Sequence, residues 1–274
     1  MTLYFAHLTD THINKPGHNP MFNLNMTDKL RQAFEQLGKL AEKPAFVVIS
    51  GDLTQDGDTD DYRHLRAVLD EESEKLGVPV HVGLGNHDSR PAFREGYLGE
   101  APSEASYYYS VNEQGLRLIV LNTQVPGTHD GRLDEEQLEW LRGELSTPAP
   151  LGSIIVLHHP VLPTMTDAMD THLLANPEAL GEVIEGTDVI GLLSGHIHFN
   201  SIGLFHGVPS AAITGVAFGL DPTDHNGMRF IDNSGYNLVL VKQGKMIATP
   251  AYIPGEQPVV FEMSYEAMKA HAHA

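Results

Sequence analysis

Short, uninterrupted apolar runs recur along the first two thirds of the chain, and most of them end in a polar cluster. The runs occupy residues 3–8, 45–49, 78–84, 116–121, 153–157 and 189–193. Apolar runs of this length without alternation are typical of strands that are buried on both faces. This pattern restricts the chain to a layered fold built around buried sheet.

Stretches with helical spacing of apolar residues lie between several of these runs. They cover residues 27–41, 60–76 and 134–145, and a further helix is expected to begin at Asn176-Pro177, a cap residue followed by proline. Strands that alternate with helices indicate the α/β class. Residues 201–260 instead carry short apolar runs broken by glycine and proline, which favours antiparallel strands that complete or flank the sheet. We expect one domain, with a core over residues 1–200 and a β-rich part over residues 201–274 that completes it.

The charge balance restricts the partners. The 274 residues include 17 Lys+Arg against 36 Asp+Glu, which gives a net charge of −19 with histidine neutral. Affinity for a nucleic acid backbone or an anionic membrane depends on clustered Lys and Arg, so both partners are disfavoured. No stretch approaches the roughly 18 apolar residues of a membrane span, and the N-terminus lacks the pattern of a signal peptide. We expect a cytoplasmic protein that acts on a small molecule and forms a homo-oligomer, with the β-rich part as a candidate contact.

Five polar clusters at the ends of the apolar runs are rich in Asp and His. They are Asp10-Thr11-His12, Gly51-Asp52, Gly85-Asn86-His87-Asp88, His158-His159-Pro160 and Gly195-His196-Ile197-His198. Each cluster taken alone has a plainer interpretation, such as a turn or a packed histidine. Ligands collect beyond the carboxyl ends of strands in open α/β sheets, so we expect the five clusters to meet at one edge of the sheet. Together they predict a metal site with oxygen and nitrogen ligands, and the absence of cysteine excludes a thiolate site.

The spacing within the clusters suits metal ions. Residues i and i+2 lie on the same side of extended backbone, so an Asp-x-His or His-x-His pair can grip one ion. Asp52 has two carboxylate oxygens and can bridge two ions. The glycines at 51, 85 and 195 allow sharp turns and a close approach. Two ions roughly 3.5–4 Å apart can clamp a phosphoryl group and activate a water molecule.

The order of the five clusters resembles that of the calcineurin-like metallophosphoesterases. Within them, the chain is most similar to the bacterial class III cyclic nucleotide phosphodiesterases and the related glycerophosphodiesterase, over residues 10 to 198. The resemblance implies a four-layered αββα sandwich, here with a β-rich C-terminal extension, around two metal ions (Fe, Mn, Zn or Co). It implies that the first ion is held by Asp10, His12, Asp52 and His198, and the second by Asp52, Asn86, His158 and His196.

The resemblance also implies roles for neighbouring residues. Relatives with a single histidine in the fourth cluster carry it at the first position, which favours His158 over His159 as the ligand. His87 matches the family residue that contacts the substrate phosphate and protonates the leaving oxygen, and we expect Asp88 to orient its ring. Gln55 stands where the purple acid phosphatases carry a metal-binding tyrosine, so tyrosinate ligation is not expected.

The function expected from the resemblance is hydrolysis of small phosphodiesters, of the cyclic nucleotide or glycerophosphodiester type, by a metal-activated hydroxide. The lack of Lys and Arg in the five clusters favours diesters over monoester dianions. A phosphomonoesterase, a phosphonate-ester hydrolase and a non-catalytic scaffold with the same fold stay open as alternatives. Four segments are candidates for the substrate walls or for ordinary surface loops: residues 21–23, 129–131, 162–174 and 218–225.

Overall fold

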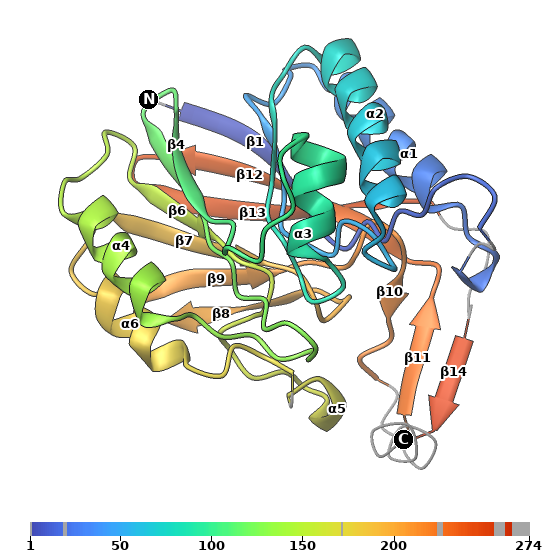
Figure 1. Ribbon diagram of the computed structural model, residues 1–274. Coiled ribbons are helices and arrows are strands. Elements are labelled where there is room, and N and C mark those ends of the chain that lie inside the picture. The colour runs from blue at the N-terminus through green and yellow to red at the C-terminus, as the bar shows by residue number, and fades with distance from the viewer. Residues whose placement is uncertain (1, 19–20, 171, 224–226, 255–260, 265–274) are drawn as a thin grey trace.

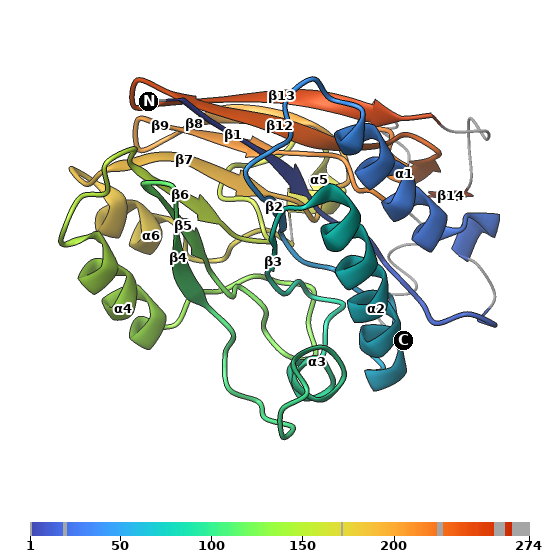
Figure 2. The same cartoon turned by 90° about the horizontal axis from the view of Figure 1, so that it is seen from above.

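Two β-sheets pack face to face, and helices cover the outer face of each (Figures 1 and 2). The computed structural model describes residues 2–18, 21–170, 172–223, 227–254 and 261–264. The α/β fold predicted from the sequence is confirmed, and the layers follow the order helix, sheet, sheet, helix.

The first sheet has the strand order β13-β12-β1-β2-β3. Its strands are β1 (Thr2–Leu8), β2 (Val47–Ile49), β3 (Val80–Val82), β12 (Ser234–Lys242) and β13 (Lys245–Ile253). The strands β1, β2 and β3 run parallel, whereas β12 is antiparallel to both β1 and β13. The helices α1 (Met26–Gly38) and α2 (Thr59–Leu76) cover the outer face, where Leu30 and Leu65 are fully buried.

The second sheet has the strand order β4-β5-β6-β7-β9-β8. Its strands are β4 (Tyr109–Glu113), β5 (Leu116–Val120), β6 (Ser153–Val156), β7 (Val189–Ser194), β8 (Ser201–Phe205) and β9 (Val208–Ala212). The helices α4 (Glu135–Leu145) and α6 (Pro177–Ile184) cover its outer face, where Leu141 and Leu180 are fully buried. Asp134 caps α4 by accepting a hydrogen bond from the Gln137 amide at 2.8 Å, as its sequence position predicts.

One hydrophobic core lies between the two sheets. Phe5 and Val48 of the first sheet and Leu118 and Val156 of the second are fully buried there. Such side chains point inward from both sheets, which explains the continuous apolar runs in the sequence: the opposite face of each strand packs against helices.

The C-terminal part contributes to three sheets. The strands β8 and β9 extend the second sheet and β12 and β13 extend the first, while a small third sheet has the order β10-β11-β14. Its strands are β10 (Gly219–Leu220), β11 (Gly227–Ile231) and β14 (Phe261–Ser264), and it stands apart from the sandwich in Figure 1. Short helical turns complete the described chain: η1 (Met21–Asn23), α3 (Arg90–Phe93), η2 (Arg94–Leu98) and α5 (Asp167–Asp170). Nowhere in the described ranges is there a helix of the length and apolarity needed to cross a membrane.

The expectation that all five clusters follow strands of one sheet is wrong. The clusters at Asp10, Asp52 and Asn86 follow β1, β2 and β3 of the first sheet, whereas those at His158 and His196 follow β6 and β7 of the second. An apolar run specifies a buried strand but not the sheet that the strand joins, because both sheets of the sandwich are buried on both faces. The clusters converge because the parallel strands of both sheets end at the same side of the sandwich.

Candidate metal centre

The backbone at the candidate site is left-handed at residues that normally avoid this region. The φ angles are 52° at Asp10, 44° at His12, 47° at Asp52, 70° at His196 and 55° at His198. A non-glycine residue at positive φ costs of order 1–3 kcal/mol, and such residues gather at functional sites. Five of the seven predicted metal ligands therefore sit on strained backbone that turns directly from a strand end toward one point.

Two of the predicted glycines allow this close approach. Gly51 has a φ of 114°, and a Cβ added there would lie 2.8 Å from Nδ1 of His158. A Cβ added at Gly85 would likewise lie 2.8 Å from Nε2 of the same ring. Contacts this short do not occur, so any larger residue would push His158 away from the site.

The first group consists of Asp10, His12 and His198, whose ligand atoms lie within 4.8 Å of one another. Nδ1 of His12 lies 2.8 Å from Oε1 of Gln55, and Nδ1 of His198 lies 3.0 Å from the Phe218 carbonyl oxygen. Because these oxygens accept hydrogen bonds, each Nδ1 carries a proton, and the two Nε2 atoms face each other 3.4 Å apart.

Asp10 adds a negative charge to this group. Its Oδ2 accepts a hydrogen bond from the His196 amide at 3.0 Å, and its fully buried Oδ1 lies 3.3 Å from Nε2 of His198. Burial opposes ionisation, yet the nearby His198 outweighs it and holds the pKa of Asp10 well below its ordinary value. Two facing Nε2 atoms and an ionised, buried carboxylate are a donor set that a cation would satisfy.

The second group is centred on His158. Its Nε2 lies 3.3 Å from Oδ2 of Asp52 and 3.0 Å from Oδ1 of Asn86, while its Nδ1 donates to the Ser50 carbonyl oxygen at 3.1 Å. Burial disfavours a charged ring, but ion pairing with Asp52 outweighs it and raises the pKa of His158 to about 9. The side-chain oxygens of Asp52 and Asn86 therefore favour a positive charge at the position next to Nε2 of His158.

Asp52 lies between the two groups. The same Oδ2 that faces His158 lies 3.8 Å from Nε2 of His12, and Oδ1 accepts a hydrogen bond from the His87 amide at 2.9 Å. Burial opposes ionisation of Asp52, but the neighbouring His158 holds its pKa well below the ordinary value. From this position between His12 and His158, its carboxylate would be shared by metal ions held at the two groups.

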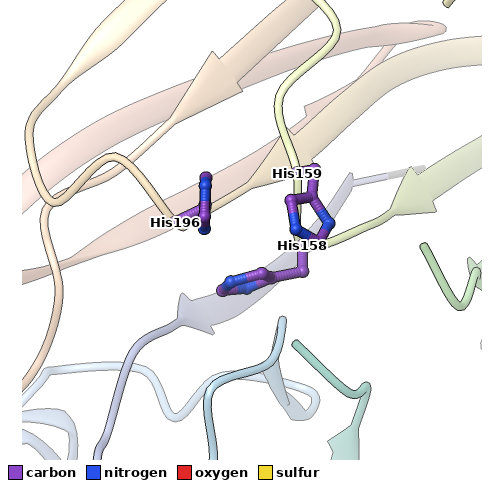
Figure 3. A group of neighbouring side chains, drawn as sticks. All are labelled: His158, His159 and His196. Atoms are coloured by element: carbon purple, nitrogen blue, oxygen red, sulfur yellow. The ribbon is translucent and has the colours of Figure 1, made fainter. Parts of the chain in front are cut away.

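His196 lies beside His158 and His159 (Figure 3), and the three offer ligand atoms within 4.8 Å of one another. Both nitrogens of His159 are occupied, because Nδ1 lies 2.7 Å from the Thr123 hydroxyl and Nε2 donates to the His129 carbonyl oxygen at 3.1 Å. In contrast, Nε2 of His196 is buried without a partner in the described part of the chain. These hydrogen bonds favour His158 and His196 as ligands and give His159 a packing role.

His87 lies at the cavity beside the metal groups, but the expectation that Asp88 orients it is wrong. Nδ1 of His87 donates to the Gln55 carbonyl oxygen at 3.0 Å, which leaves Nε2 to face the cavity. The buried Asp88 carboxylate instead accepts hydrogen bonds from the Gly85 amide at 2.8 Å and the Tyr62 hydroxyl at 2.8 Å, and from the Leu53 amide. A residue adjacent in sequence points to the opposite side of this turn, so Asp88 ties the second and third clusters together rather than reaching His87.

Two further residues contact the site in ways that the sequence analysis did not assign. Gln55 orients His12 through its side chain and His87 through its carbonyl oxygen. His129 accepts a hydrogen bond from Nδ2 of Asn86 at 2.9 Å, which directs Oδ1 of this amide toward His158. His129 belongs to one of the four candidate substrate segments, but no local pattern in the sequence singles it out from the other histidines.

A cavity of about 340 Å³ opens beside both groups. Each of the four candidate substrate segments contributes to its lining, through Phe22, His129, Met169 and Phe218, although residues 171, 224 and 225 of two segments lie outside the described residues. Within the described ranges no lysine or arginine lines it. The cavity thus combines a polar floor of candidate metal ligands with walls from distant loops.

A two-sheet sandwich whose strand ends bring Asp, Asn and His side chains around two neighbouring points is the arrangement of a dimetal hydrolase. The model of the family described as calcineurin-like phosphoesterase matches residues 3–200. The chain belongs to this family.

Similar proteins agree with this assignment. The cAMP/cGMP dual specificity phosphodiesterase of Mycobacterium tuberculosis (strain CDC 1551 / Oshkosh) is 36% identical over 255 residues, which are 92% of this chain and 80% of the relative. The glycerophosphodiester phosphodiesterase GpdQ of Enterobacter lignolyticus is 27% identical over 72% of this chain and 71% of its own length. A crystal structure of a dimetal phosphatase from Danio rerio superposes with a TM-score of 0.65 at 18% identity, over 95% of this chain and 99% of that one, which shows the shared fold. The predicted family, fold class and metal-dependent phosphodiester hydrolase are confirmed.

Proposed function

We propose that this protein hydrolyses small phosphodiesters at a dimetal centre, with cyclic nucleotides as the substrate class. The observation that carries the proposal is the pair of ligand groups that share Asp52, with His87 beside them at the same cavity. The relatives named as cyclic nucleotide phosphodiesterases support the substrate class.

The residues present fit two metal ions. Asp10, His12 and His198 would hold one and Asn86, His158 and His196 the other, with Asp52 between them. Bound metals supply Lewis acidity and lower the pKa of water from 15.7 to about 7. The nitrogen and oxygen donors are compatible with Fe, Mn, Zn or Co, and we propose one of these for each position.

His87 performs the proton chemistry in this proposal. In hydrolysis the oxygen of water forms a new bond to phosphorus while the bond from phosphorus to the ester oxygen breaks. The Gln55 carbonyl oxygen holds the proton of Nδ1, so a protonated His87 can donate from Nε2 to the departing alkoxide. The backbone amide of His87 donates a hydrogen bond to Oδ1 of Asp52, which holds the ring beside the two groups of candidate ligands.

The cavity lining disfavours a phosphomonoesterase, whose substrate carries one more negative charge than a phosphodiester. A phosphomonoester dianion is bound best by added cationic side chains, and no lysine or arginine lines the described part of the cavity. A non-catalytic scaffold would have no need for five strained ligand residues around a buried, ionised carboxylate. The homo-oligomer, the cytoplasmic location and the division of the chain at residue 200 stay predictions.

The test measures hydrolysis by protein of known metal content. Bis(p-nitrophenyl) phosphate and cyclic AMP should be cleaved in the presence of Mn²⁺, and p-nitrophenyl phosphate more slowly. Chelation should abolish cleavage of all three. Faster cleavage of the monoester would contradict the diesterase, and no cleavage of any substrate by metal-loaded protein would contradict the enzyme.

A further inference from the structure

The cavity beside the metal groups has two chemically different sides. One side is formed by candidate metal ligands and by His87, which would face a phosphoryl group. The other side is formed by phenylalanine and methionine side chains: Met21, Phe22, Phe218, Met228 and Phe230. A ligand that fills this cavity therefore combines a charged phosphate with an uncharged, apolar part.

The apolar side is built around three aromatic rings, Phe22, Phe218 and Phe230, which we call the aromatic wall. The ring centroids lie 5.2 Å apart for Phe22 and Phe218, 5.1 Å for Phe22 and Phe230, and 5.5 Å for Phe218 and Phe230. Phe261 of β14 stacks on Phe22 at 5.4 Å. Rings in direct contact form one continuous surface, whereas a cage for a quaternary ammonium group needs open space between its rings.

The aromatic wall begins directly at the metal groups. Phe218 stacks on His198 with a centroid distance of 4.5 Å and an interplanar angle of 7°, and it lies 5.3 Å from His12. An ester group attached to a phosphate at the metals would therefore lie within reach of the wall. The small third sheet brings Phe230 to this place, and η1 brings Phe22 from the opposite end of the chain.

The backbone of Phe22 adopts a strained, left-handed conformation. Its φ and ψ are 54° and 22°, and the following Asn23 also has a positive φ of 58°. The left-handed region is unusual for a bulky aromatic residue, and strain of this kind persists where the surroundings fix it, often at ligand sites. The packing of the ring on Phe218 and Phe230 supplies that constraint, and the ring also lines the cavity.

We propose that the aromatic wall is the subsite for a planar, uncharged ring carried by the phosphodiester, such as the base of a cyclic nucleotide. The proposal rests on the proposed phosphodiesterase function and adds the residues that select the substrate. Stacking on aromatic side chains is tolerant of which base is present, since every base has a flat π-face. The wall thus favours nucleotides as a class over diesters whose ester groups are small, polar or cationic, such as glycerophosphocholine.

The test compares a phosphate ligand that carries a base with ligands that lack it. Binding of AMP, ribose 5-phosphate and inorganic phosphate to the Mn²⁺-loaded protein is measured by calorimetry, and hydrolysis of bis(p-nitrophenyl) phosphate is followed separately. We expect AMP to bind about tenfold or more tightly than ribose 5-phosphate, the size of one base stacking contact. Phe22→Ala and Phe230→Ala should remove most of this difference, while affinity for inorganic phosphate stays the same. For cyclic AMP they should raise KM more than they lower kcat, because the wall does not touch the reacting atoms.

Matched variants keep the proposal falsifiable. Phe22→Leu retains an apolar side chain without the ring and should lie between Phe22→Ala and the wild type. Tyr108→Ala removes a ring that packs on Trp140 of α4, away from the cavity, and should change none of these affinities. Equal binding of AMP and ribose 5-phosphate to the wild type would overturn the proposal. So would a difference that survives in the wall variants, or an equal loss of phosphate binding. Failure to hydrolyse the diester would contradict the proposed function. The binding comparison would still test the aromatic wall, because it does not depend on hydrolysis.

Discussion

The polar floor of the cavity and its aromatic wall are built on opposite principles. The floor consists of side chains at the ends of parallel strands, and hydrogen bonds anchor several of them, such as the bond between His12 and Gln55. The wall consists of rings from η1, from the segment after β9 and from β11, which touch one another without hydrogen bonds between them. The floor is fixed by the sheets, whereas the wall is fixed by its own packing.

We expect this difference to divide two tasks: the floor would carry out catalysis, and the wall would select the substrate. Strand ends cannot shift without moving the sandwich, so the floor suits the precise placement that metal ions and proton transfer require. Phe22 and Phe230, carried by η1 and by the small third sheet, are only partly buried and can change without loss of the strands that hold the ligands, so the wall suits recognition of the ester group. Four changes test this contrast, in order of the effect that we expect.

The largest effect is expected from loss of the residue shared by both ligand groups. Asp52→Ala removes the oxygen that lies between His12 and His158, so both metal positions should lose affinity. Metal content measured by mass spectrometry should fall, and diesterase activity should fall by roughly 10³-fold or more, the several kcal/mol that metals supply. Asp70→Ala, an exposed partner of Arg66, is the matched control and should keep both metals. Full metal content in Asp52→Ala would contradict the bridging position.

His87→Ala should separate turnover from metal binding. A general acid contributes about 10²- to 10⁴-fold, so kcat should fall by that factor while both metals stay bound. The loss should be smaller for p-nitrophenyl esters, whose leaving group needs no proton, than for cyclic AMP. Parallel loss of metal and activity would show that His87 belongs to the ligand set instead.

Gln55→Leu should weaken one metal position only. The change removes the acceptor for Nδ1 of His12 but keeps the carbonyl oxygen that holds His87. Loss of such an outer partner typically costs 10- to 100-fold in metal affinity, measured here by metal titration. Gln55→Glu keeps an acceptor oxygen at this position and should restore much of that affinity. Unchanged affinity in Gln55→Leu would mean that the strained backbone alone orients His12.

The smallest effect is expected on the stability of the protein when Phe22 is replaced. Phe22→Gly and Phe22→Ala remove the same ring contacts, but only glycine adopts a φ of 54° without penalty. The free energy of unfolding, measured by urea denaturation, should therefore be about 1 kcal/mol higher for Phe22→Gly than for Phe22→Ala. Equal stabilities would show that the backbone at residue 22 relaxes once the ring is gone.

The sequence predicts the floor more fully than the wall because each ligand pair is local to one strand end. Asp10 and His12 are two residues apart, as are His196 and His198, and a buried apolar run precedes each pair. The chosen residues converge in the structure as the order of the clusters predicts. What the sequence could not supply is which sheet each strand joins, since the strands of both sheets have the same apolar pattern.

Contacts between distant segments were decided by tertiary structure alone. Asp88 lies next to His87 in the sequence but forms a hydrogen bond with Tyr62. In the same way, His159 lies next to His158 but forms a hydrogen bond with Thr123. In each pair the turn sends neighbouring side chains in different directions, and only the packing around them determines which one reaches the site.

By itself, the sequence determined the family, the α/β class and the candidate metal ligands, because these depend on residue types and on spacing within short segments. Tertiary structure decided the two-sheet arrangement, the partners of Gln55 and His129, and the aromatic wall. Phe22 and Phe230 are about two hundred positions apart, and their rings meet only because the third sheet folds back over η1. A contact of that kind leaves no periodic trace in the chain, since it depends on how whole elements pack and not on the residues beside it.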